Sequence, residues 1–181
     1  MKVLKNREIY ALNTGNVWHN PEEISIKINP FILTSVNPES YTLRASEHVT
    51  IYNQGEKTET KIGPDGLLLQ PESLYCIRVA EHIEFEKLDY LISGLNVIEA
   101  TSPINKKTDN FIVWIEPTQP RHIHCGTPIA EIRFIRYRVG KHLGINPEID
   151  RFFNNIDKKM DFRGVPQNPY IMDVRNRFPK K

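Results

Sequence analysis

Short apolar stretches separated by turn-forming residues run through the first two-thirds of the chain. The stretches are rich in Val, Ile, Tyr and Thr, and prolines and glycines stand between them, a pattern typical of an all-β barrel or sandwich. We therefore expect a mainly β fold. The predicted strands are 24–28, 41–44, 48–52, 66–69, 74–79, 90–91, 97–98, 111–115, 122–124 and 130–137.

The last predicted strand shows the clearest alternation of apolar and polar residues. Successive side chains of a strand point to opposite faces, so Ile132 and Phe134 share one face and we expect them to point inward. The basic residues Arg133, Arg136 and Arg138 fall on both faces. Only part of this basic group can therefore contribute to one patch.

Helical patterns occur near both ends of the chain. Residues 6–12 predict a short helix that ends before Gly15, and residues 147–154 predict another helical turn. From Asp157 onward the sequence is polar, basic and interrupted by prolines, which is typical of an arm or tail.

The length of 181 residues is enough for one domain with extensions. We expect a β domain with a short helical segment at 1–140 and a C-terminal extension at 141–181.

The apolar runs are too short to cross a membrane. Residues 1–12 contain no apolar core of a secretory signal. Cys76 and Cys125 are isolated, as reduced thiols in a cytoplasmic protein would be.

Four segments carry a more specific signal through their order along the chain. The first combines Leu-Lys-Asn-Arg-Glu-Ile at 4–9 with 28–44, which ends in Asn-Pro-Glu-Ser-Tyr-Thr-Leu-Arg. The second covers 66–83. The third, 123–134, contains Cys-Gly-Thr-Pro-Ile-Ala. The fourth is Lys-Met-Asp-Phe-Arg-Gly at 159–164.

In this order, the segments resemble the dCTP deaminases and their dUTPase relatives. The resemblance implies a dUTPase-like fold, a distorted β-barrel or jelly roll with a short N-terminal helix and an extended basic C-terminal tail. It also implies a homotrimer with sites between subunits, Mg²⁺ bound through the nucleotide triphosphate, and a tail that closes over the ligand.

The resemblance is weakest in the segments that bind the nucleotide. The family's Gly-Arg-Ser-Ser-Leu-x-Arg segment, which contacts phosphates, corresponds to Leu-Ile-Ser-Gly-Leu-Asn-Val-Ile at 91–98, with one serine and no arginine. The family elements that shape the pyrimidine pocket fall at 99–102 and 104–107. The nucleotide-binding residues that the resemblance implies are Ser93, Asn96, Thr101, Asn105 and Arg163.

The resemblance also implies one catalytic carboxylate. Deamination of a cytosine ring without zinc needs a group that takes a proton from water and passes it to the leaving amine. Glu116 is the only nearby match, but its spacing from Asn105 is one residue longer than in the family. Either a loop insertion lets Glu116 face the pocket, or Ile115 occupies that position and Glu116 is the polar end of a strand. The zinc deaminase signature is absent.

Two further groups of residues permit more than one interpretation. His122, His124 and Cys125 offer three metal-ligating side chains within four residues, and two histidines at i and i+2 share a strand face. Polar residues at a strand edge before a turn are the other interpretation. The scattered aromatics Trp18 and Trp114 could stack on bases or belong to a core or interface.

Three functions fit these observations. The preferred hypothesis is a protein that binds a pyrimidine deoxynucleotide, with catalysis lost or altered, because removing one charge-stabilising donor costs ~10²–10³ in rate. The second is a non-enzymatic homotrimeric structural or assembly subunit whose tail binds a neighbouring subunit or protein, of phage or viral origin. The third is an active dCTP deaminase, or a dUTP diphosphatase, with a rearranged site. Enzymatic activity is left open.

Overall fold

The computed structural model describes residues 1–101, 110–137 and 142–159. The predicted site residues Asn105 and Arg163 lie outside the described residues, as do Arg138 and most of the predicted tail.

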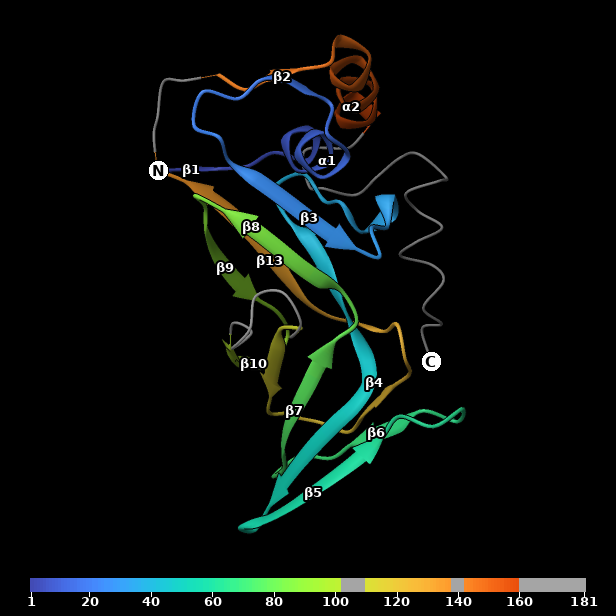
Figure 1. The fold of residues 1–181 in the computed structure, drawn as a ribbon. Helices are drawn as coiled ribbons and strands as arrows, with labels where there is room; N and C mark the ends of the chain where they lie inside the picture. Colours follow the sequence, from blue (N-terminus) through green and yellow to red (C-terminus); the bar gives the residue numbers. More distant parts are fainter. Residues whose placement is uncertain (102–109, 138–141, 160–181) are drawn as a thin grey trace.

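The order of helices and strands confirms a mainly β fold with a short N-terminal helix (Figure 1). The N-terminal half contains β1 (Lys2–Val3), α1 (Asn6–Thr14), β2 (Val17–His19), β3 (Ser25–Asn29), a 3₁₀ turn (Leu33–Ser35), β4 (Tyr41–Asn53), β5 (Glu56–Lys61), β6 (Leu67–Leu69), β7 (Leu74–Val79) and β8 (His82–Glu86). The rest contains β9 (Asp89–Ser93), β10 (Val97–Thr101), β11 (Ile112–Ile115), β12 (Arg121–Ile123), β13 (Pro128–Arg136), β14 (Gly144–Ile145) and α2 (Pro147–Lys159).

The first helix begins and ends where the sequence predicts. The Glu8 carboxylate accepts a hydrogen bond from the Lys5 backbone N–H at 2.9 Å, which satisfies a donor at the start of α1. Gly15 has a φ of 72° and ends the helix in the left-handed conformation that glycine adopts without strain.

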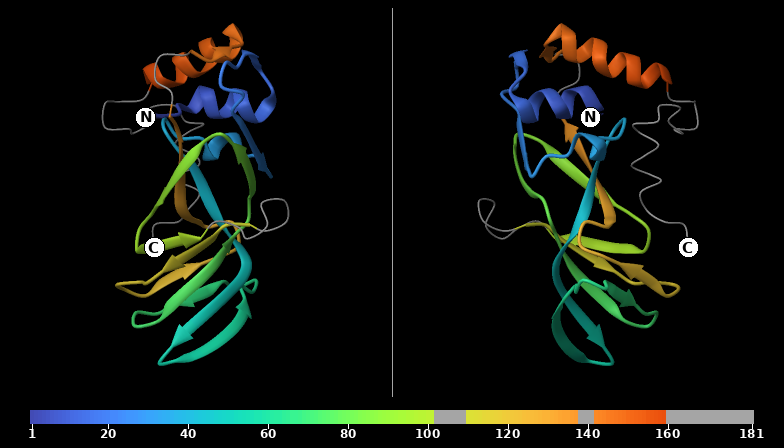
Figure 2. Two further views of the ribbon diagram at one scale, coloured as in Figure 1. Left: turned by 60° about the vertical axis from the view of Figure 1, so that its left-hand side comes forward. Right: turned by 90° about the vertical axis from the view of Figure 1, so that its right-hand side faces the viewer.

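An antiparallel sheet of eight strands forms the centre of the molecule, in the order β1-β13-β4-β7-β11-β10, with β5 added to β4 and β9 added to β13. Smaller antiparallel pairs are β12 with β6, β14 with β2, and β3 with β8. The β4–β5 hairpin extends to the end of the molecule opposite the helices (Figure 2).

The prediction of two strands at 41–44 and 48–52 is wrong, because both belong to the single strand β4. The pairing of β4 with β7 shifts between Ala45 and Val49. An irregularity of this kind bends a strand and interrupts its alternation without ending it. The N-terminal half of β4 pairs with β13, and its C-terminal half pairs with β7. The strand β4 therefore joins the two parts of the sheet.

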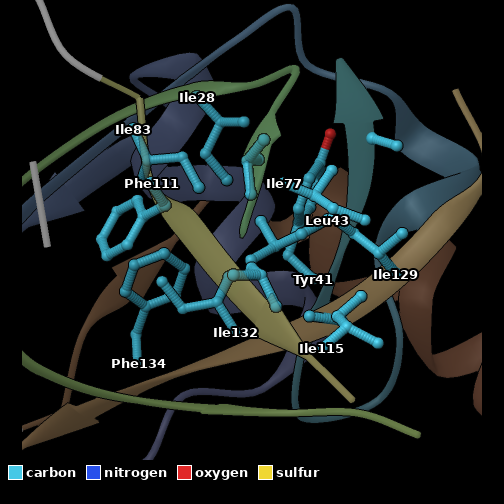
Figure 3. Close-up of a cluster of buried hydrophobic side chains, with 14 of the residues drawn as sticks. Ile28, Tyr41, Leu43, Ile77, Ile83, Phe111, Ile115, Ile129, Ile132 and Phe134 are labelled. Atoms are coloured by element: carbon cyan, nitrogen blue, oxygen red, sulfur yellow. The ribbon is translucent and has the colours of Figure 1, made fainter. Parts of the chain in front are cut away.

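The core is formed by apolar side chains from β3, β4, β7, β8, β11 and β13 (Figure 3). Ile132 and Phe134 are fully buried, which confirms the predicted inward face of β13. Complete burial of such a side chain contributes about 1.5–3 kcal/mol. Arg136 continues this inward face, whereas Arg133 is exposed on the other one.

The helices pack together at one end of the β body (Figure 2). The ring of Phe153 from α2 is buried and lies 5.4 Å from the ring of Tyr10 in α1. Arg7 forms an ion pair with Asp150 at 3.0 Å. The predicted helical turn at 147–154 is therefore part of α2, and the predicted boundary at residue 140 stays a prediction. Within the described ranges, no helix is long and apolar enough to span a membrane.

Candidate functional site: a polar corner between β9, β10 and β11

The segment 91–98, which the resemblance aligns with a phosphate-binding motif, covers the end of β9, the following turn and the start of β10. Gly94 lies so close to β13 that a Cβ atom there would come within 2.8 Å of the Ile129 carbonyl oxygen. Asn96 has a φ of 61°, in the left-handed region, where asparagine is among the better tolerated residues. A glycine and an asparagine thus allow a tight reversal of the chain against β13.

Glu116 meets this turn from the neighbouring strand. Its backbone N–H donates a hydrogen bond to the Asn96 carbonyl oxygen at 3.0 Å. Ile115, the last residue of β11, is buried in the core, whereas Glu116 is exposed. By the alternation of the strand, Glu116 follows the outward face that carries Trp114. The structure therefore places Glu116 directly after β11, with its side chain exposed and its backbone hydrogen-bonded to Asn96.

Ser93 is half-buried at the end of β9, directly opposite Glu131 of β13. The Glu131 carboxylate accepts hydrogen bonds from Ser40 Oγ at 2.8 Å and from Asn37 Nδ2 at 3.4 Å. Ser40 belongs to the Asn-Pro-Glu-Ser-Tyr segment that carries the resemblance, and it is itself buried. This network is a part of the corner that sequence reasoning missed, although the alternation of β13 already put Glu131 on the face opposite Ile132.

The remaining predicted residue in the described ranges is not brought to this corner. Thr101 is the last residue of β10 and pairs with Ile112 at the far end of β11. Thr101 lies four positions further along the strand than Val97, which corresponds to about 13 Å. The corner therefore joins Ser93, Asn96 and Glu116, and we name these three residues the β9–β11 corner.

Three arginines near the core, Arg44, Arg121 and Arg136, are engaged in ion pairs or hydrogen bonds of their own. Arg44 binds the fully buried Glu81 at 2.5 Å, and Arg136 binds Glu22 at 2.6 Å. Arg121 donates a hydrogen bond to the Pro128 carbonyl oxygen at 3.3 Å. Arg78 is exposed on the outward face of β7, opposite Ile112. Of these four arginines, Arg78 is the one whose side chain is exposed.

The described residues contain no group of three or more His, Cys, Asp or Glu side chains placed to hold a metal ion. A metal that entered the corner would therefore depend on ligands from a bound molecule, such as phosphate oxygens, which are the oxygen donors that Mg²⁺ prefers.

Comparisons with known proteins identify dCTP deaminases among the proteins similar to this chain. No protein-family model matches the chain. A dUMP-forming dCTP deaminase of Leptospira biflexa is 27% identical over 161 residues, covering 74% of this chain and 91% of the relative. A dUMP-forming dCTP deaminase of Hathewaya histolytica is 38% identical over 89 residues, covering 45% of this chain and 52% of the relative.

A solved structure shows the same fold. The chain is similar to 2'-deoxycytidine 5'-triphosphate deaminase from Agrobacterium tumefaciens, with a TM-score of 0.55 and 16% sequence identity. The similarity covers 84% of this chain, which spans only about half, 52%, of the solved chain.

The architecture is thus a dUTPase-like β fold, and the resemblance to the dCTP deaminase and dUTPase superfamily is confirmed. The similarity to several dCTP deaminases supports the description of the chain as a dCTP deaminase-like protein.

Proposed function

We propose that this dCTP deaminase-like protein binds a pyrimidine deoxynucleotide at the β9–β11 corner and that deamination there is lost or altered. One observation carries the proposal: Glu116 remains at the corner beside Asn96, whereas the adjoining segment 91–98 has one serine and no arginine. In this proposal Glu116 takes the place of the deaminase carboxylate, while the segment beside it lacks the forked cations that normally hold phosphates.

The chemistry of the corner follows from these groups. Ser93 offers one hydroxyl donor to a phosphate oxygen, and Asn96 offers an amide. Glu116 would take a proton from an attacking water and pass it to the leaving amine. The segment 91–98 itself supplies no guanidinium group to neutralise the triphosphate, and each missing donor costs ~10²–10³ in rate. Mg²⁺ would be held by the phosphates of the nucleotide. Asn105 and Arg163 remain proposed contacts, and Thr101, at the far end of β10, remains one only for the part of the nucleotide that extends away from the corner.

The proposed assembly is a homotrimer in which a second copy covers the corner. Three large apolar side chains around the turn are exposed: Leu91 by 51%, Leu95 by 68% and Ile98 by 59%. Exposed apolar residues gathered in this way mark an interaction surface more often than scattered ones do. A neighbouring copy would bury them and supply further ligands, and the C-terminal tail would bind that neighbour. We expect the assembly to be cytoplasmic.

Calorimetric titration with dCTP, dUTP and dTTP in the presence of Mg²⁺ tests the proposal, with released ammonia and pyrophosphate measured in the same mixtures. We expect binding with little or no turnover. Turnover that disappears in Glu116→Gln would instead make the protein an active deaminase. The matched control is Glu56→Gln, which removes an exposed carboxylate from the β4–β5 hairpin and leaves the corner intact.

A second candidate function is a non-enzymatic homotrimer that serves as a structural or assembly subunit. The exposed Leu91, Leu95 and Ile98 favour it, because they support assembly without requiring a ligand. A folded trimer that binds none of the three nucleotides would favour this function over nucleotide binding.

A further inference from the structure

Two histidines lie side by side at the end of β12, outside the β9–β11 corner: His122 belongs to the strand, and His124 directly follows its last residue, Ile123. His122 and His124 are both exposed, and Ile123 between them is buried on the opposite face. Their ring centres are 4.9 Å apart, and the ring planes are inclined by 69°. The strand predicted at 122–124 ends at Ile123, but the exposed–buried–exposed alternation continues through His124 and puts two imidazoles on one accessible face.

The backbone of Gly66 faces the two rings. A Cβ atom built on Gly66 would lie 2.6 Å from Cε1 of His122 and 2.9 Å from Cε1 of His124. Since Cε1 stands between the two nitrogen atoms of an imidazole, the nitrogen-bearing edges of both rings converge on one place. Gly66, with a φ of 84°, occupies a conformation that other residues rarely adopt, so the space is kept free of a side chain.

The backbone around the pair is held by hydrogen bonds. His122 belongs to the three-residue pairing of β12 with β6, where it lies opposite Leu68. The His124 N–H donates to Thr127 Oγ1 at 2.8 Å. Ligands on such supported backbone keep their mutual geometry, which lowers the cost of bringing two of them to the same ion.

We propose that His122 and His124 form a two-imidazole site for a divalent transition-metal ion of the borderline class, such as Zn²⁺ or Ni²⁺. A metal–nitrogen bond of about 2.1 Å puts each ring centre about 3.2 Å from the ion, so a tetrahedral angle separates the centres by about 5.2 Å. The observed 4.9 Å is close to this separation. Imidazole is a preferred ligand for these metals.

Cys125 follows the pair in sequence, but it is not a third ligand of this site. Its Sγ lies 3.8 Å from the Ile62 carbonyl oxygen, toward which the thiol is directed. Throughout the described part of the chain, no group of three metal-ligating side chains occurs. The ion would thus keep positions for water or an outside ligand, and its affinity would be that of a two-ligand chelate.

Calorimetric titration of the full chain with Zn²⁺ and with Ni²⁺, in a buffer that does not bind metals, tests this site. We expect His122→Ala and His124→Ala each to weaken binding at least about tenfold, because either change removes half of the chelate. His48→Ala is the matched control, since His48 is an exposed histidine on β4 beside Glu47. Cys125→Ser should bind as the unchanged protein does.

Equal metal affinity in the unchanged protein and in the double alanine variant would overturn the proposal. It would also be overturned if His48→Ala lost as much metal affinity as His122→Ala, or if Cys125→Ser lost a large part of it. NMR spectra of the imidazole groups in the unchanged protein provide a second measurement that does not depend on any variant folding. Addition of diamagnetic Zn²⁺ should shift the resonances of His122 and His124 before those of His48. Shifts confined to other histidines would also rule out the site.

Discussion

The two cysteines lie in different surroundings, and this difference predicts their reactivity. Cys76 is half-buried on β7, directly opposite Trp114, whose ring stacks with that of Tyr52. Burial raises the pKa of the Cys76 thiol, which lowers the fraction of the reactive thiolate. Cys125 is exposed. We expect iodoacetamide to alkylate Cys125 first in the folded protein. Timed samples analysed by peptide mass spectrometry check this order, and faster labelling of Cys76 would contradict it.

The phenol of Tyr41 is a second residue whose surroundings lead to a prediction. Its ring is fully buried, and its Oη accepts a hydrogen bond from the Ile32 N–H at 3.0 Å. Tyr41→Phe leaves that donor without its acceptor, so we expect a loss of about 1–3 kcal/mol of unfolding free energy in urea denaturation. Tyr137→Phe, at an exposed tyrosine, should change stability little. Equal effects of the two changes would refute the prediction.

Tyr41 also predicts how stability depends on alkaline pH. Burial raises its pKa in the folded state, so the folded protein holds this proton more tightly than the unfolded chain does. The resulting stabilisation is complete below the ordinary tyrosine pKa of about 10 and is lost as pH rises through the folded value. Urea denaturation across this pH range should show that the free energy of unfolding falls less at alkaline pH in Tyr41→Phe than in the unchanged protein. A parallel decline in both proteins would count against this assignment.

At the scale of elements, the close approach of the β9–β10 turn to β13 can be tested with one added methyl group. Gly94→Ala puts a carbon 2.8 Å from the Ile129 carbonyl oxygen, a backbone atom that cannot move aside cheaply. We expect a loss of about 1–3 kcal/mol in chemical denaturation, as for an overpacked site. At Gly63 nothing lies within 4 Å of such a carbon, so Gly63→Ala is the control. If Gly94→Ala left the free energy of unfolding unchanged, the turn would lie further from β13 than the structure places it.

A buried ion cluster joins three elements at the helical end of the molecule. Arg136 on β13 binds Glu22 in the loop before β3 at 2.6 Å and lies 3.8 Å from Glu8 on α1. Glu22→Ala leaves the buried Arg136 charge with the more distant Glu8, so we expect a loss of up to about 3 kcal/mol in thermal or urea unfolding. Glu23→Ala breaks an exposed pair with Lys87 and should cost far less. Similar losses in both variants would contradict the structural role of the cluster.

At the scale of the whole molecule, the proposed homotrimer predicts how charge at the corner affects assembly. Leu95→Lys and Ile98→Lys put a cation into the surface that a second copy would bury, at a cost that dissociates the assembly. Sedimentation analysis should show three chains for the unchanged protein and one for these variants. Leu68→Lys, at an apolar residue of β6 exposed by 46%, should remain a trimer. A monomeric unchanged protein would refute the assembly and leave nucleotide binding to be tested separately.

Local patterns were sufficient to predict part of the fold. The helix at 6–12, its end at Gly15 and the strand 74–79 follow from capping residues and apolar periodicity, and the structure confirms them. The strand β5 was missed because its residues, Glu56–Lys61, are polar and nearly all exposed. Its backbone is held by pairing with β4 rather than by burial of one face, so no alternation marks it in the sequence.

The sequence by itself determined the mainly β character, the inward face of Ile132 and Phe134 and the family resemblance, because each depends on residues close together in the chain or on the order of motifs. Only the tertiary structure decided that 41–53 is one bent strand, that Glu116 meets Asn96, and that Thr101 lies away from them. These outcomes depend on the register between strands that are distant in sequence. A shift of one residue would reverse which side chains face the corner, and local patterns do not specify that register.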